Sequence, residues 1–90
     1  MVRSANELLN KSVENAANEN VGDINDVRID NSGNVAAVIV GVGGFLGLGE
    51  KNVALTFDQT KLARDSDGNL VVTADVTKES LQAAPEYKKP

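Results

Sequence analysis

The sequence contains neither cysteine nor histidine among its 90 residues. Without cysteine the chain has no disulfide and no thiolate ligand for zinc, so cysteine usage gives no redox compartment. Without histidine it also lacks the usual general base and the commonest metal-binding side chain. Most templates of enzyme catalysis are thereby excluded, and we predict no catalytic residue, no cofactor and no enzymatic activity.

Aromatic residues and positive charge are also scarce. The chain has two Phe, one Tyr and no Trp, and its 13 acidic against 9 basic residues give a formal net charge of -4. Negative charge repels a phosphate backbone, and so few aromatic rings cannot form a platform for stacked bases. Nucleic acid is therefore not an expected partner.

Long hydrophobic runs are absent as well. The longest nearly uncharged stretch, Val35–Gly49, has fifteen residues with five glycines, whereas a membrane-spanning helix needs about 20 apolar residues. The first ten residues hold one basic residue and no apolar run, so we expect no signal peptide within this sequence. A mature exported domain would look the same, and the compartment stays open on these grounds.

What the sequence does contain is alternation of apolar and polar residues. Val27 and Ile29 alternate with charged neighbours, which predicts a half-buried strand. The three-residue step from Val21 to Ile24, with Gly22 inside it, predicts a bulge in that strand, with Gly22 as a structural glycine.

Three further strands follow the same reasoning. Residues 35–40 are continuously apolar and rich in β-branched side chains, which predicts a central strand covered on both faces. Alternation predicts two more strands, at Val53–Phe57 and at Leu70–Ala74. We therefore predict an all-β fold, a small and mostly antiparallel β-barrel.

Turn and capping residues punctuate these strands. Gly33 within Asp30–Asn34 and the dipeptide Asp67-Gly68 are typical of hairpin turns, where glycine accepts a positive φ. Ser4–Glu7 spells a capping box, which predicts a short helical turn near the N-terminus. Thr77 is a candidate N-cap of a second short helix, which Pro85 would end.

These patterns predict one domain over residues 4–85 and a solvated tail over residues 86–90.

Carboxylates are the remaining candidates for chemistry. Asp23, Asp26 and Asp30 could line one strand and accept a hard cation such as calcium, but a solvated strand face explains them more simply. Asp65–Asn69 has the start of a calcium loop without the glycine and glutamate that an EF-hand needs further on. We read it as a hairpin turn, and we predict no metal site.

The glycine-rich segment Gly41–Lys51 is the most unusual stretch of the chain. It does not have the spacing of a phosphate-binding loop, and we interpret it as an irregular hairpin connection. Phe45 and Leu46 lie in it between glycines: they would plug the end of the barrel or form a subunit interface, or else form an exposed anchor for a partner. The candidate interaction residues are Phe45, Leu46 and Leu48, and the candidate structural glycines are Gly22, Gly33, Gly44, Gly47 and Gly49.

The run VGDINDVRIDNSGNVAAVIVGVGGFLGLGEKNVALTFDQ resembles the PRC-barrel family, the domain of the photosynthetic reaction centre H subunit. The similarity continues through Leu62 and Val71-Val72 to the closing TKESLQAAPEY, and so covers nearly the whole chain. Two positions depart from the family pattern: Asn10 stands where a glycine is usual, and Thr56 where many relatives have proline.

This resemblance implies a small β-barrel that serves as an interaction module without catalytic residues. It also implies frequent self-association, so a homo-oligomer and a protein partner of unknown identity are expected. Many stand-alone bacterial versions look like exported proteins, which favours the periplasm over the cytoplasm. The alternative function is a barrel that binds a small ligand or a cation.

Overall fold

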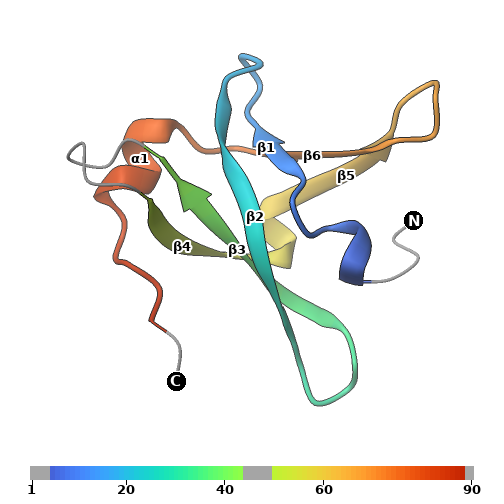
Figure 1. Ribbon diagram of the computed structural model, residues 1–90, viewed down its shortest axis with the longest axis horizontal. Coiled ribbons are helices and arrows are strands. Elements are labelled where there is room, and N and C mark those ends of the chain that lie inside the picture. Colours follow the sequence, from blue (N-terminus) through green and yellow to red (C-terminus); the bar gives the residue numbers. More distant parts are fainter. Residues whose placement is uncertain (1–4, 44–49, 89–90) are drawn as a thin grey trace.

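The computed structural model describes residues 5–43 and 50–88. Within these ranges the chain forms six strands, two short 3-10 helices and one short α-helix (Figure 1). The elements are η1 (Ala5–Glu7), β1 (Ser12–Glu14), β2 (Asn20–Ile29), β3 (Val35–Val42), β4 (Lys51–Thr56), η3 (Phe57–Gln59), β5 (Thr60–Arg64), β6 (Leu70–Ala74) and α1 (Lys78–Ala83).

The strands form one sheet in the order β4-β3-β2-β1-β6-β5. All neighbours are antiparallel except β1 and β6, which pair in parallel. The chain passes from β4 at one end of the sheet to β5 at the other through η3, and in Figure 1 the β5–β6 hairpin crosses the direction of β2 and β3. The predicted small, mostly antiparallel β fold with short terminal helical segments is confirmed.

The core lies between the inner faces of this folded sheet. Leu81 of α1 and Leu8 after η1 close it, both with 2% or less of their surface exposed. Burying each such side chain stabilises the fold by about 1.5–3 kcal/mol. The core cluster consists of Leu8, Val13, Val21, Ile24, Val38, Val40, Val42, Val53, Leu55, Leu70, Val72, Ala74 and Leu81.

Strand β3 is covered on both faces from Val38 onward, as its continuous apolar sequence predicts, whereas Val35 and Ala37 are half-buried and Ala36 is exposed. Every residue from Val38 to Val42 is buried. The strand is longer than the predicted range 35–40, because Gly41 and Val42 still pair with β4, opposite Asn52 and Lys51. The glycine-rich connection therefore begins later than expected.

Two strands, β1 and β5, were not predicted from the sequence. β1 has three residues with one fully buried side chain, Val13, and so has no period to detect. β5 carries Lys61 and Arg64 beside only one large apolar residue. A third correction concerns Phe57, which was expected at the end of a strand but begins η3, where the Gln59 side chain accepts from the Thr56 main-chain N–H.

Bulges in β2 explain the three-residue step from Val21 to Ile24. Val13 of β1 pairs with Gly22 and the next residue pairs with Asn20, so Val21 is an extra residue in the ladder. Both Val21 and Ile24 consequently reach the core. At Gly22 the backbone of β3 comes so close that an added Cβ would lie 2.5 Å from the carbonyl oxygen of Gly41.

The C-terminal helix follows its capping signals. The Thr77 side chain accepts the main-chain N–H of Ser80, and Ser80 Oγ accepts the N–H of Thr77. The helix ends at Ala83, because a residue that precedes proline, here Ala84, is kept out of helical geometry. In the expected tail Glu86 and Lys88 are exposed, whereas Tyr87 is half-buried.

Candidate interaction surfaces

The structure describes only part of the predicted site. Gly22 packs against β3 as above, and Gly33 has a φ of +83° in the turn between β2 and β3. The other predicted positions lie outside the described residues: Gly44, Phe45, Leu46, Gly47, Leu48 and Gly49. The alternatives for Phe45 and Leu46, plug, interface or anchor, therefore stay predictions.

The first surface is the free edge of β5. All five residues of this strand pair with β6 on one side, and within the described part of the chain no strand pairs with its other side. Lys61 and Ala63 are exposed on the outer face, while Leu62 is half-buried and packs against the core. An unpaired strand edge presents main-chain donors and acceptors to any other extended chain.

The opposite edge of the sheet, at β4, is partly covered. The main-chain N–H of Tyr87 donates to the carbonyl oxygen of Asn52 over 2.7 Å. Figure 1 shows this segment leaving α1 on the β4 side of the sheet. The residues after the helix thus cover this edge through one main-chain hydrogen bond.

Beside this edge lies an open cleft of about 350 Å³. Its lining combines two amides, one carboxylate, one aromatic ring and one aliphatic side chain: Asn25, Asp26, Ile39, Asn52 and Tyr87. Ile39 has 2% of its surface exposed, yet it points away from the main core because both its neighbours in β3 point into that core.

A bulge brings Asn25 to this cleft, and a glycine makes room for the polar network beside it. Asn25 is an extra residue between Ile24 and Asp26 of β2, whose partners Val40 and Ile39 are adjacent in β3. Its Nδ2 donates to Glu50 Oε1 over 2.6 Å and to Asn52 Oδ1 over 3.1 Å. A Cβ at Gly41 would collide with the side chains of Asn25 and Glu50, so the polar network needs glycine there.

A buried lysine lies on the other face of β4. Lys51 has 7% of its surface exposed, and its Nζ donates to the carbonyl oxygen of Gln82 over 2.6 Å. This carbonyl belongs to the last turn of α1, where main-chain oxygens lack partners within the helix and attract positive charge. Lys51 therefore fastens α1 to the sheet.

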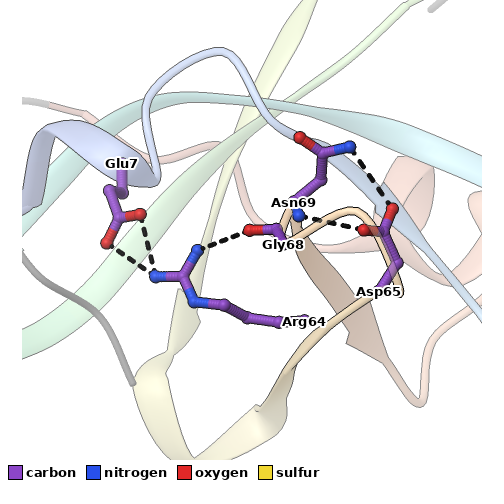
Figure 2. A network of polar contacts seen from close by, with 5 residues as sticks. All are labelled: Glu7, Arg64, Asp65, Gly68 and Asn69. Carbon is purple, nitrogen blue, oxygen red and sulfur yellow. Dashed lines mark hydrogen bonds and ion pairs between the residues drawn. The ribbon is translucent and has the colours of Figure 1, made fainter.

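A surface ion pair fastens the N-terminal turn to the β5–β6 hairpin (Figure 2). Arg64 Nη2 lies 2.9 Å from Glu7 Oε2, and Arg64 Nη1 donates to the carbonyl oxygen of Gly68 over 3.0 Å. Both charged side chains remain about one quarter exposed, at 24% and 25%. Such a pair contributes at most about 1 kcal/mol, so its role is to position η1.

The same five-residue turn occurs twice. In Asp30–Asn34 and in Asp65–Asn69 the aspartate side chain accepts the main-chain N–H groups of the residues two and four positions later. The glycines of the two turns, Gly33 and Gly68, have φ values of +83° and +85°. At Asp65 these bonds, first that from Asn69, hold the pKa of the carboxyl below its ordinary value.

The carboxylates do not assemble into a metal centre in the part of the chain that the structure describes, where no group of three potential ligands comes together.

A broader groove of about 630 Å³ lies between the β1–β2 loop and the β5–β6 side of the sheet, and Asn15, Asp58, Lys61 and Val76 are among its lining residues. Asn15 is buried there because its Oδ1 accepts from Ala17 and Glu19.

Of the residues of the β4 cleft, sequence reasoning named only Asp26, as a candidate ligand for a cation on a strand face. Asn25 and Asn52 lie far apart in sequence, and only the bulge in β2 brings them together. The one available signal was the single tyrosine of the chain, Tyr87, which is unusual in an otherwise polar tail.

The fold and its two contrasting edges define a small, mostly antiparallel β-sheet module. Comparison with protein families identifies it: the profile of the PRC-barrel domain matches residues 1–81, and the chain belongs to this family. PRC-barrel domains are generally non-catalytic modules. A search of the curated proteins finds no match. No helix in the described ranges is long and apolar enough to cross a membrane.

Proposed function

We propose that this protein is a non-enzymatic interaction and assembly module that self-associates through the edge of β5. The observation that carries the proposal is the outer edge of this strand, with which no other strand pairs among the residues that the structure describes. The unpaired main-chain donors and acceptors of a strand edge are satisfied most simply by another strand of the same length. The β5 strand of a second copy of this chain has that length.

The residues of β5 suit pairing with a second copy. An antiparallel pair centred on Leu62 uses the whole strand and sets Lys61 opposite the partner's Ala63. Thr60 then faces the partner's Arg64. No like charges stand directly opposite each other, and the two sheets become one continuous sheet.

Charge substitutions at Ala63 test this arrangement, because the side chain is exposed and the fold does not depend on it. Ala63→Lys places a second positive charge opposite Lys61 twice in the dimer, and Ala63→Glu places a negative one. Such pairs differ by about 0.2–1 kcal/mol each. We expect Ala63→Lys to raise the dimer dissociation constant by about two- to thirtyfold and Ala63→Glu to lower it.

Sedimentation velocity over a concentration series measures these constants. Combining Ala63→Lys with Lys61→Glu restores opposite charges and should restore the dimer, while circular dichroism checks that every variant is folded. A native chain that stays monomeric at all concentrations contradicts the self-association, and equal constants for the Lys and Glu variants contradict the β5 interface.

A further inference from the structure

The β4 edge differs from the β5 edge because the chain itself already occupies it. Tyr87 donates its main-chain N–H to Asn52 and lines the cleft beside β4. Among the described residues beyond α1, Tyr87 alone hydrogen-bonds to the sheet, and its neighbours Glu86 and Lys88 are exposed. The contact is thus a single point of attachment at the end of a short connection.

The cleft and the contact at its edge come from different parts of the chain. The PRC-barrel match ends at residue 81, within α1, whereas Asn25, Ile39 and Asn52 of the cleft all lie inside it. The matched residues therefore supply the strand edge and most of the cleft lining, and Tyr87, after the match, occupies the edge at Asn52.

We propose that the edge of β4 beside this cleft is a docking site for an extended peptide segment that carries an aromatic residue followed by a basic one, and that the chain's own Tyr87 occupies this edge until such a segment displaces it. This inference rests on the proposed function as an interaction module and names a second surface for it. The incoming segment adds to the edge of β4 by main-chain pairing, a common mode of peptide recognition.

The chemistry of the cleft defines the occupant. Asn52 offers a main-chain oxygen to an N–H donor, and the buried side of Ile39 offers an apolar contact to a ring. Asp26 lines the cleft, and Glu50 accepts a hydrogen bond from the lining residue Asn25, so the cleft has one acidic side chain in its lining and a second beside it. In the chain's own segment Lys88 follows Tyr87, which is the same order of aromatic and basic residues.

Closure by the chain's own segment lowers the affinity for a peptide supplied in solution. If the attached segment holds the β4 edge in nine molecules of ten, the apparent dissociation constant of a competitor rises about tenfold. Releasing Tyr87 should therefore free the main-chain oxygen of Asn52 for the competitor and leave Asn25, Asp26 and Ile39 in place.

The test uses the full chain and a fluorescent peptide with the sequence of residues 83–88, AAPEYK. Tyr87→Ser removes the ring and so weakens the attachment of the segment, and Tyr87→Phe is the matched control because it keeps the ring, while both variants keep the main-chain donor. We expect the Ser variant to bind the peptide about tenfold more tightly than the native chain or the Phe variant. A peptide with serine in place of its tyrosine should not bind.

Nuclear magnetic resonance locates the bound peptide. The expected result is a set of shifted amide signals at Asn25, Ile39 and Asn52 in the Ser variant. Equal affinity for the native chain and the Ser variant, no binding to the Ser variant at millimolar peptide, or shifted signals confined to β5 would each overturn the proposal.

Sedimentation of the same samples separates this proposal from the preceding one. Self-association that persists in a Ser variant unable to bind the peptide overturns the β4 docking site and leaves the β5 interface standing. A monomer that binds the peptide through β4 overturns the β5 interface alone.

Discussion

The two halves of the sheet are built on different principles. In the half made of β2, β3 and β4, β2 is bulged, Val38–Val42 of β3 are buried on both faces, and polar side chains on the outer face form a connected network. In β6 and β5 burial alternates residue by residue, so one face packs and the other meets solvent. The comparison teaches that a substitution in the half made of β2, β3 and β4 must be compatible with packing on both faces of the sheet. In the half made of β5 and β6, a substitution on the outer face meets solvent and is tolerated.

Glycine substitutions should show the largest difference between the halves. Gly22→Ala forces a methyl group against the carbonyl of Gly41 and a methyl of Val40, both at 2.7 Å or less. We expect a loss of about 2 kcal/mol or more in the free energy of unfolding, because the contacted backbone cannot move aside.

Gly68→Ala is the matched change in the second half. Its φ of +85° disfavours a side chain, but no atom lies within 4 Å of the added group, so the cost is limited to about 1–2 kcal/mol. Urea denaturation measures both values. A Gly22 variant no less stable than the Gly68 variant would show that the close approach of β2 and β3 relaxes easily.

Two lysines give the next comparison. Lys51→Met keeps the apolar stem but removes the donor to Gln82, and we expect it to cost about 1.5–3 kcal/mol, typical of a hydrogen bond from a charged group. Lys61→Met on the exposed face of β5 should stay within about 0.5 kcal/mol of the native chain. Hydrogen exchange of the α1 amides provides a second readout, since only the Lys51 change should loosen the helix.

The smallest expected effect concerns the turn at Asp65 and depends on pH. A carboxyl whose pKa is lowered in the folded state adds stability above its unfolded pKa, and this stability is lost as the pH falls through the folded pKa. Asp65→Asn keeps an acceptor oxygen but has no charge to lose. We therefore expect the native chain to exceed the variant in melting temperature at neutral pH, with the gap closing below about pH 4.

Thermal melts between neutral and strongly acidic pH follow this gap. A gap of constant size down to the lowest pH would show that the charge of Asp65 does not contribute to the turn. Asp30→Asn, in the geometrically equal turn of the first half, shows how much of the change belongs to the shared turn geometry rather than to Asp65.

Much of the fold could be predicted from short stretches of the sequence. The capping residue Thr77, the turn glycines and the uninterrupted apolar run of β3 each act through neighbours in the sequence, and the structure places them as predicted. The step between Val21 and Ile24 even identified a bulge, because a spacing of three is incompatible with a regular strand that buries both residues.

What the sequence could not supply depends on distant partners. β1 is a strand only because β2 and β6 flank it, and β5 only because β6 pairs with it. The β4 cleft requires Asn25 to be turned outward by a bulge whose position is decided by pairing with β3. The contact of Tyr87 with Asn52 could not be predicted either, because the polar composition of the tail indicates a solvated segment.

The parallel pair of β1 and β6 has a consequence for the order of folding. β2, β3 and β4 follow one another along the chain, so each can pair with the next through a short connection. Val13 of β1, in contrast, pairs with Val72 of β6 only after most of the chain between them has folded. Contacts of such long sequence separation form slowly, because loop-closure entropy is lost before they stabilise anything. We therefore expect the β1–β6 seam to close last, and the segment from η1 to β1 to be the first to detach when the native protein opens.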